Sequence, residues 1–338
     1  MQLIKQGKKI LVFDQGQENR ASAVAAGLVN PITGKFLKQT WMAEKIFPAL
    51  FQFYKEAEDL LQQRFFYAMP IYRPFLSVEE QNEWMAESEK KLLQQFIAKI
   101  HTSSAFSQVH DPFGGVVTRH SGYLDTVAFM QAVRNFLINK NAYQEGFFGP
   151  EKLNFQQGKV HYEGMEAGNI IFCDGVGSKA NPYFSWVPIR CLKGETLTVL
   201  LKGNPEVIFN RGVYVVPTKT ENVYTVGATY QPGDTSRETT GAARKELEEK
   251  LSELIKIPFT INHQNWGIRP TTPDRRPVLG SHPEFKNLII FNGLGTKGVS
   301  LAPYYSGVLV DWLEGHGEIP FEVNIGRFKS LYSKLVLQ

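Results

Sequence analysis

Residues 287–313 constrain this chain more than any other stretch, because an apolar run, a glycine turn and a helical pattern follow one another directly. Residues 288–291 are apolar and of strand length, and Gly293, Gly295 and Gly298 then stand in G-x-G-x-x-G spacing. Apolar side chains recur after them at helical spacing, at Leu301, Tyr304, Tyr305, Val308 and Trp312. This order favours a helix N-terminus that holds a phosphate or another electron-rich group, and an ordinary tight turn is the alternative.

The same stretch lacks one feature of a dinucleotide site. Such a site needs an acidic residue at the end of a second strand, about 20 residues after the glycines. Here the sequence passes into the turn-rich EGHGEIP of residues 314–320 and soon ends. The pattern therefore predicts a ligand-facing helix start and does not require the first turn of a Rossmann unit.

Composition narrows the class of protein. The chain has 338 residues, 43% of them hydrophobic, which suits one large domain or two ordinary ones. A net charge of +4 without a dense basic run does not favour nucleic acid and leaves it open. Cys173 and Cys191 are too few for a disulfide scaffold and form no Cys/His cluster, so we expect a reducing compartment and no metal site. We also expect a cytoplasmic protein, because no apolar run reaches the ~18 residues of a membrane span and MQLIKQGKK is no signal peptide.

The N-terminus resembles the second half of a βαβ dinucleotide unit. A helix over residues 1–6 ends at Gly7, and an apolar strand, ILVF, leads to Asp14. An acid at such a strand end accepts hydrogen bonds from a ribose diol, although a surface aspartate after an ordinary strand is the alternative. The matching glycine fingerprint is expected about 20 residues upstream, before Met1.

The next segment is made of small residues. Residues 21–26 allow a ligand to approach the backbone closely, and Arg20 and Ser22 supply donors suited to a pyrophosphate. Gly27 and Asn30-Pro31 end the segment. A tight contact between a helix and a sheet is the alternative.

The rest of the chain interleaves helical and strand patterns. Helices are predicted over residues 41–63, 77–100, 125–139 and 240–255. Strands are predicted over residues 68–75, 169–174, 187–201 with a turn at Gly194, 212–217, 223–230 with a bulge or close approach at Gly227, and 261–269. Parallel-sheet pieces at the start, near residue 169 and near residue 287 thus enclose a helical insertion and an antiparallel sheet, which predicts discontinuous domains.

Several motifs in order carry a family resemblance. They are Asp14 after its strand, the Arg20-Ala-Ser segment with AAGLVNP, then CDGVGS, YVVPT, VGATYQPGD, WGIRPTTPDRRPVLG and GLGTKGVSLAP. Together they resemble the FAD-dependent D-amino-acid oxidase family, in which glycine oxidase and sarcosine oxidase are close relatives. The resemblance covers nearly the whole chain, and residues 214–313 are most similar to glycine oxidase. The GLGTKG turn is also similar to the oxidase domain of a bacterial enzyme that modifies wobble uridine in tRNA.

The resemblance implies an α/β fold with an α+β second domain. A GR2-type, Rossmann-like FAD-binding domain is expected over residues 1–36, 111–186 and 265–338. An antiparallel-sheet substrate domain is expected over residues 37–110 and 187–264. The first strand and glycine loop of the FAD domain would be missing, which implies a start codon assigned too late or a truncated chain, and a chain that short is expected to bind FAD poorly.

The resemblance also implies the residues that bind the cofactor. Asp14 would bind the adenosine ribose, Gly175 would approach from the third strand, and Arg20, Ser22 and Gly27 would line the pyrophosphate and ribityl chain. The glycine turn would face the pyrimidine end of the flavin through Gly293, Gly295, Thr296, Lys297, Gly298, Val299 and Ser300. Sarcosine oxidases attach their flavin through a cysteine at the position of Gly267, so non-covalent FAD is expected.

Three residues are implied for the substrate. Arg269, in a G-x-R-P turn, would pair with the substrate carboxylate, because a planar guanidinium holds a carboxylate by two contacts. Tyr214 matches the active-site tyrosine of glycine oxidase, and Tyr230 stands where that enzyme has an aliphatic contact, which implies a reshaped pocket. A structural arginine and aromatic core residues are the alternatives.

The implied reaction is oxidation of a C–N bond in a small amine or amino acid, with hydride transfer to flavin N5 and hydrolysis of the imine. Dioxygen or another acceptor would reoxidise the flavin. Thr225 stands where sarcosine oxidases have a lysine that acts toward oxygen, so oxidase and dehydrogenase behaviour both stay open, as does a homo-oligomer. Two further hypotheses are an enzyme acting on an aminomethyl group of a modified tRNA nucleoside and an inactive, flavin-free relative.

Overall fold

The computed structural model describes residues 1–16, 21–33 and 38–333. The predicted pyrophosphate residue Arg20 lies outside these ranges. In the described part, no helix is both long enough and apolar enough to cross a membrane.

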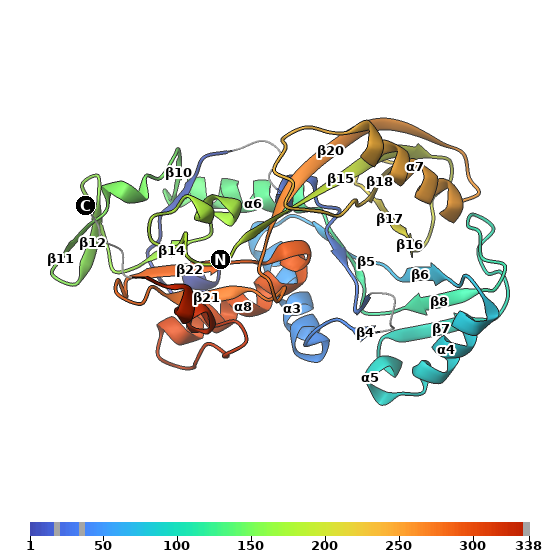
Figure 1. Cartoon of the computed structure of the whole chain (residues 1–338), viewed down its shortest axis with the longest axis horizontal. Helices are drawn as coiled ribbons and strands as arrows, with labels where there is room; N and C mark the ends of the chain where they lie inside the picture. The colour runs from blue at the N-terminus through green and yellow to red at the C-terminus, as the bar shows by residue number, and fades with distance from the viewer. Residues whose placement is uncertain (17–20, 34–37, 334–338) are drawn as a thin grey trace.

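The helices frame two groups of strands (Figure 1). The α-helices are α1 (Gln2–Lys5), α2 (Ala21–Val24), α3 (Ala43–Leu61), α4 (Val78–Ser88), α5 (Lys91–Gln94), α6 (Thr126–Asn139), α7 (Gly241–Leu254) and α8 (Gly298–Leu313). Short 3₁₀ helices are η1 (Pro150–Lys152), η2 (Gly175–Lys179), η3 (Gly295–Lys297) and η4 (Ile325–Leu331).

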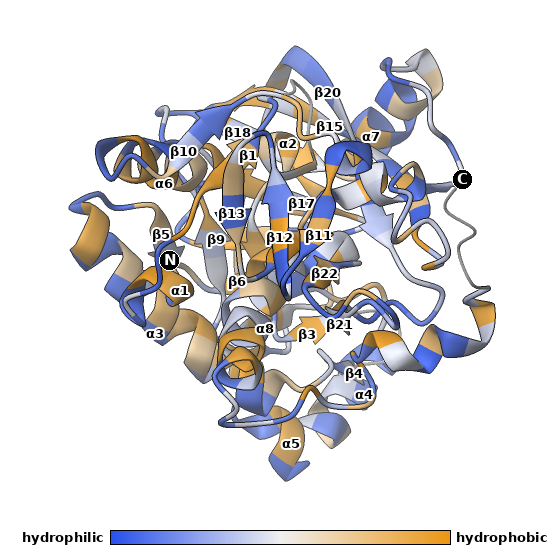
Figure 2. Cartoon of the chain, turned by 90° about the vertical axis from the view of Figure 1, so that its left-hand side faces the viewer, coloured by the Kyte–Doolittle hydropathy of each residue, from blue (hydrophilic) through white to orange (hydrophobic). Residues whose placement is uncertain are grey.

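The first group of strands is parallel in its main pairings and lies on the left of Figure 1. Here β1 (Val12–Asp14) pairs with β10 (Tyr143–Glu145), and β14 (Ile170–Phe172) pairs with β22 (Leu288–Asn292), both in parallel. β21 (Val278–Ser281) adds an antiparallel edge to β22. Beside them lies a small antiparallel sheet of β11 (Asn154–Gln156), β12 (Lys159–Tyr162) and β13 (Met165–Ala167), which faces the viewer in Figure 2.

The second group is a nine-stranded, mainly antiparallel sheet on the right of Figure 1. Its order is β19 (Gln231–Pro232), β15 (Arg190–Leu201), β18 (Val223–Gly227), β17 (Val213–Pro217), β16 (Ile208–Arg211), β6 (Ile71–Pro74), β8 (Gly115–Thr118) and β7 (Ile97–His101), and β20 (Phe259–Thr271) also pairs with β15. There are two further small sheets: β2 (Leu28–Val29), β9 (Gly122–Leu124) and β5 (Phe66–Ala68) form one, and β3 (Ile32–Thr33) and β4 (Lys38–Gln39) form the other. The predicted α/β class with an α+β part is confirmed.

The hydrophobic core follows this division. α3 packs against α8, and their buried faces share the largest apolar cluster, with Phe47, Leu50, Leu301 and Tyr305 among its members. A second cluster joins the inner side of α7 to β15, β17 and β18. Helix N-termini follow local sequence rules, since Asp125 and Thr240 accept backbone N–H bonds at the starts of α6 and α7.

Two predicted elements are wrong, each because strand pairing overrides a local pattern. The helix predicted over residues 77–100 divides into α4 and α5 and then gives way to β7, which pairs with β8. The turn predicted at Gly194 does not exist, because β15 continues through it and pairs with β20 along its whole length. A β-bulge between Thr198 and Val199 is the irregularity in this pairing.

Candidate active site

The candidate site lies on one face of strands β15 and β20. Side chains alternate across a strand, so Gly194 and Thr196 point to the opposite face from Lys193 and Glu195. On β20, Gly267 stands opposite Gly194, and Arg269 stands opposite Leu192. The guanidinium of Arg269 lies over Gly194, where a Cβ atom would come within 2.2 Å of Nη1. Glycine at this position therefore makes the room that the arginine occupies.

Within the described ranges, the guanidinium of Arg269 has no ion-pair or side-chain hydrogen-bond partner. Burial lowers the pKa of its guanidinium, and the nearby hydroxyls of Tyr214 and Tyr230 act in the opposite direction. Burial also raises the pKa of Tyr214 to about 12, so this phenol stays protonated near neutral pH and can donate a hydrogen bond. The structure thus brings together the three residues that were predicted to contact the substrate.

Glycine again makes room for Tyr214. Tyr214 on β17 pairs with Gly227 on β18, and a Cβ at Gly227 would stand 2.7 Å from the tyrosine hydroxyl. The predicted close approach at Gly227 is therefore confirmed. Thr225 lies two residues before Gly227 on β18 and so points to the same face of the sheet.

The glycine turn after β22 stands beside the end of β20. Asn292 Nδ2 donates to the carbonyl of Gly175 at 2.8 Å, which ties the end of β22 to the end of β14. Gly293 and Gly295 then adopt φ of +71° and +56°, a conformation that favours glycine. Leu294 forms a bridge with Thr271 of β20. The predicted succession of strand, turn and helix is confirmed, and it leads the start of α8 toward the face that carries Arg269.

The start of α8 offers donors and a cation. No side chain caps its first turn, so backbone N–H groups there lack the side-chain acceptor that often satisfies them. Lys297, at the N-cap, lies 3.4 Å from the hydroxyls of both Thr33 and Thr40. Burial lowers the pKa of Lys297, and Arg275 lowers it further. These features suit an electron-rich group.

A second region of predicted cofactor residues lies around β1 and α2. Asp14 ends β1, and its carboxylate accepts the backbone N–H of Gly16 at 3.2 Å and lies 3.4 Å from the hydroxyl of Tyr143. Ser22 is exposed on α2. This short helix packs on β20 where Gly267 leaves room, since a Cβ there would lie 2.6 Å from Val24.

Two of the predicted cofactor glycines have packing reasons of their own. Gly27 adopts φ of +67°, and a Cβ on it would lie 1.9 Å from the carbonyl oxygen of Leu124. Gly175 has φ of +57°, and a Cβ on it would lie 3.8 Å from the ring of Pro270, near the end of the strand that carries Arg269. Their roles toward a cofactor stay predictions.

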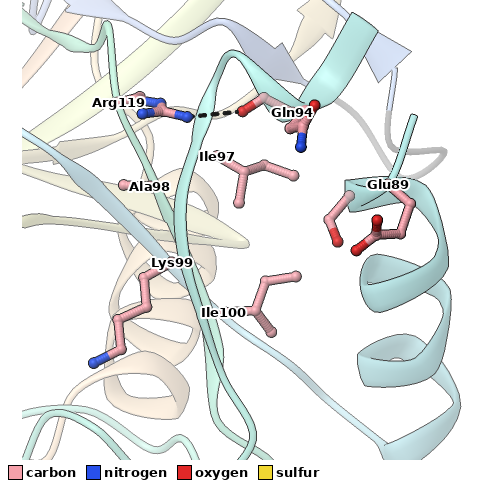
Figure 3. Close-up of a pocket in the computed structure, with 8 residues that line it drawn as sticks. Glu89, Gln94, Ile97, Ala98, Lys99, Ile100 and Arg119 are labelled. Atoms are coloured by element: carbon pink, nitrogen blue, oxygen red, sulfur yellow. Dashed lines mark hydrogen bonds between the residues drawn. The ribbon is translucent and has the colours of Figure 1, made fainter. Parts of the chain in front are cut away.

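A separate pocket lies at the far edge of the nine-stranded sheet (Figure 3). It is lined by β7 and by the ends of α4 and α5, and Arg119 donates there to the carbonyl of Gln94 at 3.1 Å. None of the predicted site residues lines this pocket.

Sequence reasoning missed two residues of the site. Gly194 was assigned to a turn, and only its pairing with Gly267 reveals its relation to Arg269. Arg275 was passed over within a loop, although its guanidinium carbon lies 5.7 Å from the ring centre of Tyr230. The available signal was its place after Pro-Asp in a turn, a position that often needs positive φ.

Comparisons with known proteins fit this architecture. Residues 1–312 match the family model of the FAD dependent oxidoreductases, or DAO family. Glycine oxidase of Geobacillus kaustophilus is 33% identical over 155 residues, which make up 44% of this chain and 39% of that relative. MnmC of Idiomarina loihiensis, a bifunctional protein of tRNA 5-methylaminomethyl-2-thiouridine biosynthesis, is 30% identical over 137 residues, 38% of this chain and 22% of that relative.

The matched segments span well under half the length of these curated relatives. Over the whole fold the likeness is broader. The crystal structure of glycine oxidase from Geobacillus kaustophilus matches with a TM-score of 0.75, covering 94% of this chain and 91% of that one at 17% identity.

Proposed function

The chain belongs to the FAD-dependent oxidoreductase family, and from this premise we propose that it oxidises the C–N bond of a small amine or amino acid. In this reaction the substrate loses a hydride from its α-carbon and a proton from its amine nitrogen. Water then hydrolyses the imine to a carbonyl compound and ammonia, or an amine when the substrate is a secondary amine. FAD, when bound, supplies the two-electron acceptor at N5 of its ring, and dioxygen or another acceptor reoxidises it.

The residues present fit FAD. The carboxylate of Asp14 at the end of a parallel strand suits a ribose diol, with Ser22 and Gly27 nearby along the chain. At the other end, the uncapped start of α8 and the cation of Lys297 suit the pyrimidine edge, where reduction of a flavin adds negative charge. Gly267 leaves no thiol at the position used for covalent attachment, so non-covalent FAD is part of the proposal.

Arg269 carries the proposal for the substrate. A half-buried guanidinium without a carboxylate partner among the described residues is costly unless an anion binds it. An amino-acid carboxylate fits its planar donors, and the protonated hydroxyl of Tyr214 adds a further donor. These two groups would hold the substrate in one orientation.

The division of labour between domains is also a proposal. Residues 1–36, 111–186 and 265–338 would hold the cofactor, and residues 37–110 and 187–264 would cover the substrate. Arg269 lies close to the boundary between these sets, because β20 begins at Phe259 and ends at Thr271.

The test is anaerobic reduction of the purified protein. We expect flavin absorbance that a small amino acid or secondary amine bleaches without oxygen. Protein without any flavin absorbance would support the flavin-free alternative, and flavin that no amine or amino acid bleaches would contradict the proposed reaction. Admitting oxygen afterwards separates an oxidase, which recovers its absorbance at once, from a dehydrogenase.

A second candidate is an enzyme acting on an aminomethyl group of a modified tRNA nucleoside. The 30% identity to the tRNA-modification protein of Idiomarina loihiensis favours it, as do the cations Arg275, over the ring of Tyr230, and Lys297, at the start of α8. Mass spectrometry of tRNA nucleosides after incubation with the protein tests it. Loss of the modified nucleoside would support this candidate, and an unchanged nucleoside profile alongside bleaching by small amines would contradict it.

A further inference from the structure

The geometry points to a further residue of the cofactor site: we propose that Asn292 is a positioning residue, which holds the turn after β14 and the turn after β22 at the separation that bound FAD requires. This inference rests on the proposed function, because each turn contains a glycine that was predicted to face the cofactor, Gly175 in the first and Gly293 in the second. Asn292 would act through these two turns.

Asn292 stands where two parallel strands end side by side. β14 pairs with β22 in parallel, and continuation of this register places Asp174 beside Asn292. The carboxyl ends of neighbouring parallel strands form the crevice in which α/β sheets bind ligands. The next residues, Gly175 and Gly293, both have positive φ and begin the two turns. A ligand that contacts both turns therefore depends on the distance between them.

The side chain of Asn292 contacts both turns at once. It is 3% exposed. Its Nδ2 donates to the carbonyl of Gly175 at 2.8 Å and to Oδ1 of Asp174 at 3.2 Å. Its Oδ1 accepts the backbone N–H of Gly293 at 2.8 Å. One buried amide thus uses its donors on the first turn and its acceptor on the second.

The partners of this amide are themselves fixed in place. Ser178 Oγ donates to the same carbonyl of Gly175 at 2.9 Å, and Asn181 Nδ2 donates to Oδ2 of Asp174 at 3.1 Å. Ser178 and Asn181 are both buried. Because the network is close-packed, a change of the amide should displace the turns themselves.

These contacts leave the donors at the start of α8 available. Asn292 bonds to Gly293, which precedes the helix, and Tyr54 of α3 donates to the carbonyl of Val299 at 2.8 Å. Neither contact occupies a backbone N–H group of residues 298–300, the first turn of α8. The two side chains therefore hold the start of the helix and leave its N–H groups for an electron-rich group.

The other end of β22 carries a matched asparagine. Asn287 Nδ2 donates to the carbonyls of Gly158, at 3.1 Å, and Gly168. Neither glycine is a predicted cofactor residue. Asn287 thus makes the same kind of bond before the strand begins, which makes it a control for loss of stability alone.

The test replaces each amide by a carboxyl group of the same shape. FAD binding is measured by dilution of the purified flavoprotein, since released FAD regains its fluorescence. Asn292→Asp sets a carboxylate against Asp174 and the carbonyl of Gly175, so we expect about tenfold weaker FAD binding at about pH 8. Asn287→Asp should leave FAD binding unchanged. A cooperative urea transition in each variant verifies folding.

Acidification distinguishes positioning from a general loss of stability. Within the described residues, Asp174 is the titratable side chain hydrogen-bonded to the Asn292 amide, and β21 places apolar Val278 on the other side. A carboxyl group introduced at position 292 should therefore have a raised pKa and, once protonated, donate to Gly175 as the amide does. Its deficit in FAD affinity should shrink to less than about threefold at about pH 5.

Asn292→Ala removes the same donor without adding a charge. We expect it to bind FAD about tenfold more weakly than the unaltered protein at both pH values. This variant also keeps the inference testable if the carboxylate of Asn292→Asp prevents folding.

Three results would overturn the inference. They are FAD binding by both Asn292 variants equal to that of the unaltered protein, an equal loss of affinity in Asn287→Asp, and a loss in Asn292→Asp that acid does not reduce. An unaltered protein without any flavin would overturn the proposed function as well. Flavin that an amine bleaches, and that the Asn292 variants hold as tightly as the unaltered protein, refutes the positioning role alone.

Discussion

Charged side chains are paired on one face of β15 and unpaired on the other. On the outer face, Lys193 and Glu195 are completely buried, and each has several partners. Glu195 accepts the N–H and hydroxyl of Thr240, at 2.9 and 3.0 Å, and the amide of Gln264, at 2.7 Å. On the inner face, Arg269 lies over Gly194 without an acid within the described residues. β15 thus holds a fully hydrogen-bonded charge network on one face, and on its other face lies the guanidinium of Arg269 from β20, which has no acidic partner among the described residues.

The difference between the paired and the unpaired charges distinguishes residues that stabilise the fold from residues suited to bind an anion. A saturated buried network holds secondary structure in register, because removal of any member leaves a desolvated charge. A buried cation without an acidic partner destabilises the fold by its desolvation cost. That cost is compensated only when an anion binds to it. Substitutions on the two faces should therefore change different measurements.

The largest effect is expected from Glu195→Ala. It leaves Lys193 buried with only Asp234 as a charged partner and removes the acceptor at the start of α7. The free energy of unfolding should fall by about 3 kcal/mol, as measured by urea denaturation. Glu249→Ala, which removes an exposed partner of Lys245 on α7, is the matched control and should leave stability unchanged.

Arg269→Ala should change substrate binding and leave the stability of the fold unchanged. We expect KM for a carboxylate substrate to rise about 100-fold, since two charge-assisted hydrogen bonds are lost, while the flavin stays bound and the urea midpoint does not fall. Steady-state kinetics and flavin absorbance measure the two sides of this prediction. An unchanged KM would remove Arg269 from the substrate site.

Gly194→Ala tests whether glycine makes the room for Arg269. The added methyl group would overlap the guanidinium and displace it, so KM should rise about tenfold. In the Arg269→Ala background the same substitution should have no further effect on KM, because the displaced group is already absent. Additive effects in the double variant would contradict this explanation.

The smallest effect is expected at His282, a buried imidazole that forms hydrogen bonds through only one of its two ring nitrogens. Nδ1 of His282 accepts the N–H groups of Glu284 and Phe285, whereas Nε2 has no partner within the described chain. Burial among aromatic rings lowers the pKa of His282 to about 4. The unfolded chain, with an ordinary pKa of about 6.5, binds a proton that the folded chain does not. This contribution to stability is therefore present above pH of about 6.5 and is lost as pH falls toward 4.

His282→Asn keeps a side-chain acceptor and lacks the titrating ring. Its urea midpoint should depend less on pH between about 6.5 and 4 than that of the unaltered protein. Parallel pH profiles of the two proteins would show that His282 does not titrate in this way.

The sequence identified what local chemistry specifies. The glycine turn of residues 293–298 and the helices over residues 125–139 and 240–255 rest on short-range rules, and they stand close to their predicted positions. Arg269, Tyr214 and Tyr230 came from the family resemblance, and the structure brings them together.

The sequence could not identify what depends on partners far along the chain. Gly194 looks like a turn residue until β20 pairs with it, 73 residues later. The network of Lys193 and Glu195 likewise needs Thr240 and Gln264 to be folded beside it. The β7 segment joined a helical pattern in the sequence because its pairing with β8 is a tertiary interaction.

The pairing of β15 with β20 also bears on how the chain reaches this fold. A slip of β15 by one residue would move Lys193 and Glu195 to the face that carries Arg269 and Gly194 to the face beneath α7. The slipped sheet would expel two charges from their partners and fill the space of Arg269. A slipped register would therefore cost free energy on both faces of β15, so the residues of the candidate site also help to select the correct register of this strand pair.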